Sequence, residues 1–465
     1  MKEPKFPSNL WATVTLGDLS EVKSGVGFPK KYQGQSSGDY PVYKVGDVSR
    51  AVTLRQGLLN SANHYVTTEE AGALKGVIFR TGSTLFAKIG EAIKLNRRAF
   101  VMRPGLADNN VMAVVPLLNE SDRFIHYFLR TVDLSDVSRS TTVPSVRKGD
   151  IEDLIIPLPP LAEQKVIADK LDTLLAQVDN TKARLERIPQ ILKRFRQSVL
   201  AAAVSGRLTG ISEESFAKIP IEQLAKPQRY SLGIGPFGSN LKVADYREAG
   251  HPLIFVREIR ANQFGDDATK YVSGEKFHEL KAHRAVPGDI LITKMGDPPG
   301  DVAIYPLECP EAVITADCIK LSVDEKAYSR DYVAYAMQSE QFRRDVLSIS
   351  AGVAQQKVNL TKFRKLTLRA PPRLEQTEIV RRVDQLFAHA DRIEKQVNNA
   401  LARVNTLTQS ILAKAFRGEL TEQWRQDHPD LISGENSAEA LLERIKAERA
   451  ATAPARRSRN AKRRR

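Results

Sequence analysis

The sequence predicts an α+β protein in which two mixed α/β domains alternate with two long helices that pair antiparallel. Three observations predict it. A segment from the middle of the chain recurs 212 residues later, between Pro159 and Pro371. Both copies carry apolar side chains every three or four residues over a long stretch. The remaining segments hold short apolar runs broken by Gly, Pro, Asp and Asn, which is typical of short strands and turns. At roughly 150 residues per domain, 465 residues allow two or three folded units.

The repeat is an internal duplication. The sequence PPLAEQ at 159–164 recurs as PPRLEQ at 371–376, and the copies then align without a gap. They end on GRLT at 206–209 and GELT at 418–421. A duplication of this kind predicts a pseudo-two-fold axis within one chain.

Each copy is expected to form one long helix. Proline is tolerated at a helix start and glycine commonly follows a helix end, so the helices should begin after the Pro-Pro pairs and stop at Gly206 and Gly418. At 1.5 Å per residue each would be about 60 Å long. Pro189 should kink the first helix. The heptad spacing predicts an antiparallel coiled coil with these seam residues: Ile167, Leu171, Leu174, Val178, Leu185, Leu192, Ile379, Val383, Leu386, Ile393, Val397, Val404 and Leu407.

The expected organisation is a first domain at 1–158, a helix at 159–208, a second domain at 209–370, a helix at 371–418, and a C-terminal segment at 419–465 with a basic, disordered tail. The two domains are only weakly alike. They share landmarks, because 40–47 parallels 251–258 and 82–91 parallels 288–297. A scaffold that stays alike while its domains diverge suggests two different recognition units.

Composition excludes several classes of protein. No run approaches the roughly 18 apolar residues of a membrane helix, and the N-terminus lacks the apolar core of a secretory signal. Cys309 and Cys318 fit no disulfide framework or zinc pattern, and the seven histidines form no metal-binding pair. We therefore expect a cytoplasmic protein without a metal. The net charge of +15 favours nucleic acid; seven basic side chains lie in the last eleven residues, and the rest keeps +8.

The chain resembles the specificity subunits (HsdS) of type I restriction–modification systems. The resemblance is carried by 155–164, by the helix ending in SVL at 198–200 and GRLT at 206–209, and by their second copies. It extends from Trp11 to about Trp424. The departures are Arg373, where leucine is usual, and Pro189.

The resemblance implies a non-catalytic DNA-recognition and assembly subunit. Two target-recognition domains would each read one half of a split double-stranded DNA site, and because the domains differ, the half-sites should differ. The helical pair would set the gap and dock two modification subunits, which bind S-adenosylmethionine and methylate adenine at N6. Two ATP- and magnesium-dependent restriction subunits would join them. This chain itself would hold no cofactor.

Two other functions stay open. A stand-alone DNA adenine methyltransferase would use Asp297 in the DPPG sequence at 297–300, although DPPG lacks the aromatic residue of the methyltransferase motif and favours a turn. The GIGPFG sequence at 233–238 fits a phosphate loop poorly, because no apolar strand precedes it and Pro236 removes an amide donor. The second alternative is a coiled-coil scaffold whose basic tail binds nucleic acid non-specifically.

Candidate DNA contacts come from basic residues beside the shared landmarks, with Lys88 and Lys294 at equivalent loop ends. Tyr40, Tyr43 and Phe237 are assigned to the core. The candidates for phosphate and guanine contacts are Lys88, Lys94, Arg97, Arg98, Arg147, Lys148, Arg257, Arg260 and Lys294.

Overall fold

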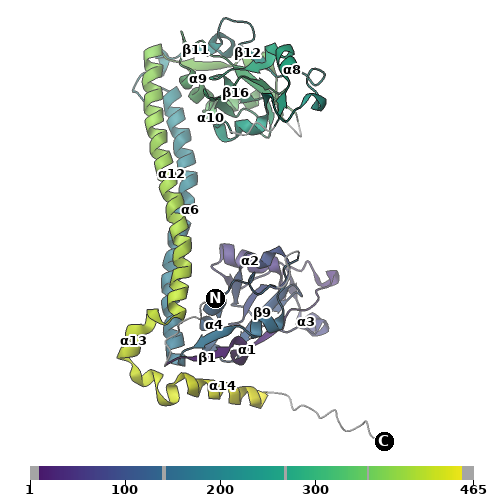
Figure 1. Ribbon diagram of the computed structural model, residues 1–465, viewed down its shortest axis with the longest axis vertical. Coiled ribbons are helices and arrows are strands. Elements are labelled where there is room, and N and C mark those ends of the chain that lie inside the picture. The colour runs from purple at the N-terminus through teal and green to yellow at the C-terminus, as the bar shows by residue number, and fades with distance from the viewer. Residues whose placement is uncertain (1–9, 139–142, 266–269, 353–355, 453–465) are drawn as a thin grey trace. The chain divides into compact units, whose positions relative to one another are not determined.

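The structure is a computed structural model that describes residues 10–138, 143–265, 270–352 and 356–452 (Figure 1). It divides into two compact units, which are considered separately. The first unit comprises residues 1–185 and 400–465, and the second comprises residues 186–399. Each unit holds one mixed α/β domain together with the ends of both long helices.

The two long helices have the bounds expected from proline and glycine. Helix α6 (Leu161–Val204) starts directly after Pro160, and α12 (Arg373–Phe416) starts directly after Pro372. Each ends two residues before a glycine with positive φ, +75° at Gly206 and +76° at Gly418. That backbone region is open to glycine at little steric cost, so the two glycines terminate the helices. Pro189 lies inside α6, which continues past it to Val204.

The helices pair antiparallel within each unit, as predicted. In the first unit the start of α6 packs on the end of α12, through Ile167 and Leu171 against Ile411 and Leu412. In the second unit the end of α6 packs on the start of α12. Leu407 is a correction to the predicted seam, because its side chain is 47% exposed. An α-helix drifts about 20° per heptad, and the inward face passes instead through Val404, Thr408 and Ile411.

The described residues of the first domain form three sheets. Strand β1 (Ala12–Thr15) pairs with β10 (Ile155–Leu158). The five-stranded sheet has the order β2 (Ser20–Ser24), β9 (Val111–Pro116), β6 (Thr84–Ala87), β7 (Arg98–Val101), β4 (Leu58–Leu59), and the three-stranded sheet has the order β5 (Tyr65–Val66), β3 (Tyr40–Tyr43), β8 (Leu106–Ala107). The helices are α1 (Leu16–Leu19), α2 (Val45–Leu54), α3 (Thr68–Leu74), α4 (Asp122–Leu129) and α5 (Lys148–Glu152).

In its described residues, the second domain repeats this plan with one further small sheet. Strand β11 (Ala217–Pro220) pairs with β23 (Thr367–Ala370). The other sheets are β12 (Leu232–Ile234), β20 (Cys318–Leu321), β16 (Ile290–Thr293), β18 (Val302–Ile304); then β14 (Tyr271–Val272), β13 (His251–Ile254), β19 (Ala312–Ile314), β15 (Arg284–Ala285); and β17 (Met295–Gly296), β22 (Gln356–Val358), β21 (Ser350–Ala351). The helices are α7 (Ile221–Leu224), α8 (Gly274–Glu279), α9 (Arg330–Met337), α10 (Glu340–Ser348) and α11 (Leu360–Lys365).

The duplication therefore includes the domains as well as the helices. Strand β3 pairs antiparallel with β5 and parallel with β8, and β13 pairs in the same two senses with β14 and β19. Each domain is tied to its long helix by the same contact. The hydroxyl of Tyr127 in α4 donates to Asp172, and that of Tyr335 in α9 donates to Asp384, 212 residues beyond Asp172. The predicted α+β class and internal duplication are confirmed.

The residues after α12 fold back onto the first domain. This segment holds α13 (Glu422–Asp427) and α14 (Ala438–Thr452). Leu441 and Ile445 of α14 join the core of the first unit, and Arg449 Nη1 donates to the Gly17 carbonyl at 2.8 Å. The predicted tail at 455–465 lies outside the described residues.

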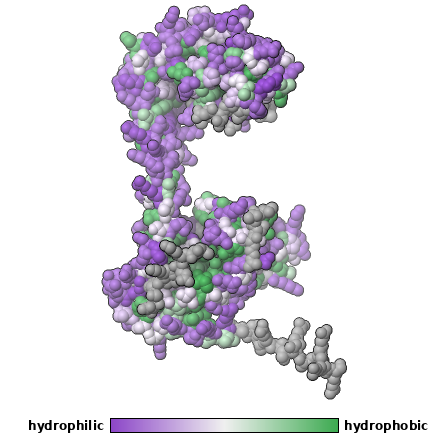
Figure 2. All heavy atoms as spheres, in the orientation of Figure 1, coloured by the Kyte–Doolittle hydropathy of each residue, from purple (hydrophilic) through white to green (hydrophobic). Residues whose placement is uncertain are grey.

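Hydrophilic side chains cover much of the face visible in Figure 2. Among the described helices, none has the length and apolar character needed to cross a membrane.

Candidate nucleic-acid interface

Lys88 and Lys294 occupy the same backbone position in the two domains. Lys88 follows β6; its amide donates to Asn110 O at 2.9 Å and its carbonyl accepts from Val146 N at 2.9 Å. Lys294 follows β16; its amide donates to Asp317 O at 2.7 Å and its carbonyl accepts from Val358 N at 2.9 Å. The backbone bonds therefore hold both lysines at one end of the central strand of their sheet.

The two lysine side chains have different surroundings. Lys88 is half-buried, and its Nζ donates to Ser24 Oγ at 3.2 Å. Lys294 is 7% exposed and its Nζ donates to Ala316 O at 3.0 Å. Burial, together with the neighbouring charge of Lys357, lowers the pKa of Lys294. Lys294 is therefore a correction to the candidate DNA contacts, because its side chain is buried whereas that of Lys88 is only half-buried.

The structure brings a second basic segment beside each lysine. The residue after each lysine forms an antiparallel backbone pair: Ile89 with Ser145 in the first domain, and Met295 with Lys357 in the second. Arg147 and Lys148 follow this segment and are exposed, and Lys148 Nζ lies 3.4 Å from Glu152 Oε1. Sequence reasoning missed the exposed Lys357, although it stands 212 residues after Ser145 and the duplication pointed to it.

The remaining basic candidates are spread over different environments. Lys94 is exposed and pairs with Glu91 at 2.9 Å, and Arg97 is half-buried. Arg257 is exposed, with its Nε 2.9 Å from Glu258 Oε1 and its guanidinium 4.4 Å from the Phe255 ring centre. The side chain of Arg260 lies outside the described residues. DNA contact by these residues stays a prediction.

Arg98 is a correction, because it is buried rather than displayed on the surface. It is 4% exposed, and its guanidinium donates to Asn96 Oδ1 at 3.0 Å and to the Val132 carbonyl. Strand β7 turns this side chain inward toward α4. A contact with DNA on the outer surface of the domain is therefore not open to it.

The glycine sequence at 233–238 makes a close contact between backbones. A Cβ on Gly235 would lie 2.0 Å from Thr315 O, and one on Gly25 in the first domain would lie 2.1 Å from Asp108 O. Gly235 thus lets the chain after β12 approach the end of β19, and Gly25 lets the chain after β2 approach the end of β8. Phe237, which the sequence assigned to the core, is 69% exposed just beyond Gly235. Tyr43 is fully buried, and Tyr40 is half-buried.

The DPPG sequence at 297–300 connects β17 to β18. Gly300 has a φ of +97°, and its amide donates to Thr293 O at 2.9 Å. This closes the segment back onto β16, as expected for a turn. Among the described residues, no group of three or more His, Cys, Asp or Glu side chains is placed to hold a metal ion.

The chain is therefore an internally duplicated protein. Each of its two related but different domains packs on the paired long helices and carries basic residues at matching strand ends. The sequence profile of the type I restriction modification DNA specificity domain matches residues 8–190 and 259–403. These segments cover more than half of the chain. The chain belongs to the family of type I restriction–modification specificity subunits.

Individual relatives agree with this assignment over the full length. The chain is 44% identical to the type I restriction enzyme StySPI specificity subunit of Salmonella potsdam, covering 97% of each chain. It is 36% identical to the EcoBI specificity subunit of Escherichia coli, over 95% of this chain and 93% of that one. A solved chain described under complex assembly and conformational transition of the type I R-M system has the same fold, with a TM-score of 0.69 at 19% identity over 89% of this chain and 99% of that one.

Proposed function

We propose that this chain reads a split double-stranded DNA site and brings modification and restriction subunits to it. The observation that carries the proposal is the duplicated domain, whose two copies bear different exposed basic side chains beside the same strand end: Arg147 and Lys148 in the first domain and Lys357 in the second. Because these backbone positions are equivalent, the two domains could bind a DNA duplex in the same way. The approximate two-fold symmetry of the duplex matches the duplication within the chain. The different side chains around these positions suit two different half-sites, since base contacts rather than phosphate contacts carry sequence information.

The first domain, with the exposed Lys94, Arg147 and Lys148, would read one half-site, and the second domain, with Arg257 and Lys357, would read the other. The paired α6 and α12 would fix the gap and dock two modification subunits, and two restriction subunits would complete the complex. The names of the relatives support this assembly. S-adenosylmethionine, ATP and magnesium would be held by the partner subunits, and this chain would act in the cytoplasm.

The experiment is a methylation map. The chain is co-expressed with its cognate modification subunit in a host that lacks DNA methylation, and N6-methyladenine is located by sequencing. We expect one split motif with adenine methylated in both halves, and no such motif when this chain is omitted.

Two outcomes would overturn the proposal. Methylation by this chain without a modification subunit would favour the enzyme, and Asp297→Ala would then test its catalytic group. An assembled complex that methylates no defined motif would favour a non-specific scaffold.

A further inference from the structure

Phe237 lies on the loop that follows β12 and presents most of its ring to solvent. Its side chain is 69% exposed. The DNA-reading proposal gives this residue no role. Some DNA-binding proteins insert an apolar side chain between neighbouring base pairs, which unstacks the base step and bends the duplex.

The loop leaves its sheet at the edge where Lys294 lies. The Gly235 amide donates to Cys318 O at 3.3 Å, and the Lys294 amide donates to Asp317 O at 2.7 Å. The chain before Phe237 and the end of β16 therefore meet at two consecutive residues at the start of β20. This places the exposed ring beside the candidate nucleic-acid interface of the second domain.

Two exposed lysines lie on segments of the same edge. Lys357 is on β22, which pairs with β17 directly after β16, and Lys242 follows Phe237 by five residues. Lysines in such places suit the phosphates of a DNA backbone. Since the edge also holds the acids Asp297 and Asp317, its distinguishing feature is the exposed ring rather than its net charge.

Hydrogen bonds fix the backbone on both sides of the ring. His283 Nδ1 lies 2.7 Å from Ile234 O, just before the loop. The Asn240 amide donates to Phe237 O at 2.8 Å, which closes a tight turn. A Cβ on Gly238, at the tip of this turn, would meet no described atom within 4 Å. The loop therefore holds the ring outward in a fixed position, so little ordering is needed when a partner binds.

The matching loop of the first domain holds its phenylalanine differently. Phe28 follows β2 and is half-buried. It packs against a buried cluster that includes Val42 and Leu106, and its ring centre lies 5.8 Å from that of His64. This ring is engaged by its own domain, whereas the ring of Phe237 projects from its domain.

We infer that Phe237 is a wedge residue, which inserts its ring between two base pairs of the half-site read by the second domain. Stacking of the ring on the exposed bases offsets part of the cost of separating them. Because Phe28 is held within the first domain, insertion is expected in one half-site only. The inference rests on the proposed function, since it requires that the domain binds duplex DNA.

The test measures DNA binding by the complex of this chain with its modification subunit. The duplexes contain the split motif from the methylation map, with an abasic residue placed at successive positions of both half-sites. A missing base lowers the cost of unstacking. We expect the parent complex to bind at least about threefold more tightly when the abasic residue occupies one position in one half-site.

The variant Phe237→Ala should bind the intact motif about tenfold more weakly and gain nothing from the abasic residue. Phe237→Trp should restore both properties. The matched control is Leu307→Ala, because Leu307 is 64% exposed and follows β18 at the opposite end of the same sheet. This control should bind every duplex as the parent does, and unchanged unfolding midpoints verify that all three variants are folded.

Three results would overturn the inference. The first is equal binding of the intact motif by Phe237→Ala and the parent, and the second is an abasic gain that persists in Phe237→Ala. The third is weaker assembly of Phe237→Ala with the modification subunit without DNA, since the ring would then belong to a protein interface. A methylation map without a motif overturns the proposed function itself, whereas a clear motif with an unaltered Phe237→Ala complex overturns only the wedge.

Discussion

Glu163 illustrates how a single buried residue ties distant parts of the first unit together. Its side chain is fully buried at the start of α6. It accepts from Trp11 Nε1 at 2.8 Å, Thr421 Oγ1 at 2.6 Å and Arg425 Nη1 at 2.5 Å. One carboxylate thus joins the start of the first domain, the first long helix and the segment after the second helix.

Replacing Arg425 by alanine should destabilise the protein strongly. Removing one partner of a buried pair leaves an uncompensated charge, which typically costs about 3–5 kcal/mol. The matched control is Arg417→Ala, which breaks the exposed pair with Glu419 and should cost less than about 1 kcal/mol. Urea unfolding measures the free energy of unfolding of each variant. Equal decreases for Arg425→Ala and Arg417→Ala would show that Arg425 does not compensate the buried charge of Glu163.

His126 makes the stability of the first domain sensitive to acid. Its pKa is about 3 in the folded chain and about 6.5 when unfolded, so the unfolded chain binds a proton first. Stability from this residue is full above pH 6.5 and is lost as the pH falls toward 3, by up to about 1.4 kcal/mol per pH unit.

The variant His126→Gln should therefore unfold with a weaker pH dependence than the parent between pH 6.5 and 4. The control is His389→Gln on the exposed face of α12, which should leave the pH profile of the parent unchanged. Unfolding midpoints by circular dichroism across this range provide the measurement. Parallel profiles for His126→Gln and the parent chain would contradict the assignment.

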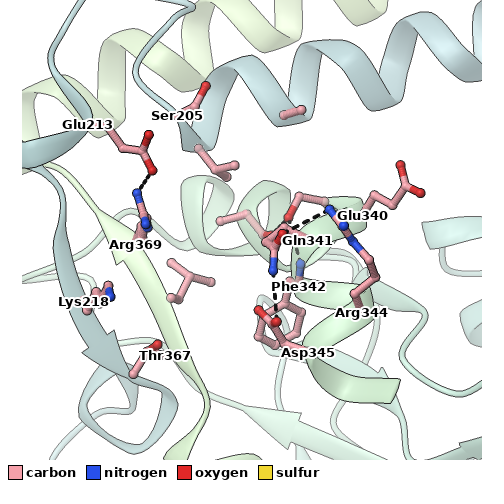
Figure 3. Close-up of a pocket in the computed structure, with 15 residues that line it drawn as sticks. Ser205, Glu213, Lys218, Glu340, Gln341, Phe342, Arg344, Asp345, Thr367 and Arg369 are labelled. Atoms are coloured by element: carbon pink, nitrogen blue, oxygen red, sulfur yellow. Dashed lines mark hydrogen bonds and ion pairs between the residues drawn. The ribbon is translucent and has the colours of Figure 1, made fainter. Parts of the chain in front are cut away.

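At the scale of elements, the two copies pack their long helices differently. In the first unit Phe416 of α12 lies between Phe124 and Phe128 of α4, with ring centres 5.2 and 5.7 Å away. The aligned positions in the second unit are Val204 for Phe416 and Ala336 for Phe128. These smaller side chains line a cavity of about 380 Å³. In Figure 3 the strands bearing Lys218 and Arg369 face α10 across this cavity, and Glu213 pairs with Arg369.

Filling this cavity should stabilise the second unit. Val204→Phe introduces the residue of the other copy, and cavity-filling changes commonly add about 0.5–2 kcal/mol. The reverse change, Phe416→Val, should cost the first unit about 2–3 kcal/mol by opening a void. Chemical denaturation of the Val204→Phe and Phe416→Val variants measures both changes in stability. A lower stability of Val204→Phe than of the parent chain would contradict the prediction.

The positions of proline and glycine in the sequence predicted the ends of the two long helices well. The burial of individual side chains was harder to predict. The Pro-Pro pairs and Gly206 and Gly418 fix the ends of α6 and α12 because their backbone restrictions act locally. The burial of Arg98 and Lys294 depends on how short strands twist into a domain, so their charges looked like those of surface residues. Phe237 was misassigned for the converse reason, since an aromatic on a glycine-rich loop has no periodicity to reveal its exposure.

At the scale of the whole molecule, the duplication keeps the scaffold constant while charge is distributed unequally. The aligned helices place Lys182 and Thr408 in one unit where Glu394 and Arg196 stand in the other. The domains likewise share strand order but differ in the basic residues beside Lys88 and Lys294. A further seven basic side chains lie in the last eleven residues, outside both domains.

Deleting residues 455–465 should therefore separate affinity from specificity. Each phosphate neutralised contributes about 0.9 to the slope of log affinity against log salt, so loss of seven cations should lower that slope by up to about 6. The methylated motif should stay the same, because the domains rather than the tail carry base contacts. Filter-binding across a salt series and a methylation map of the same truncated chain test both halves. A lost or altered motif would mean that the tail takes part in reading the sequence.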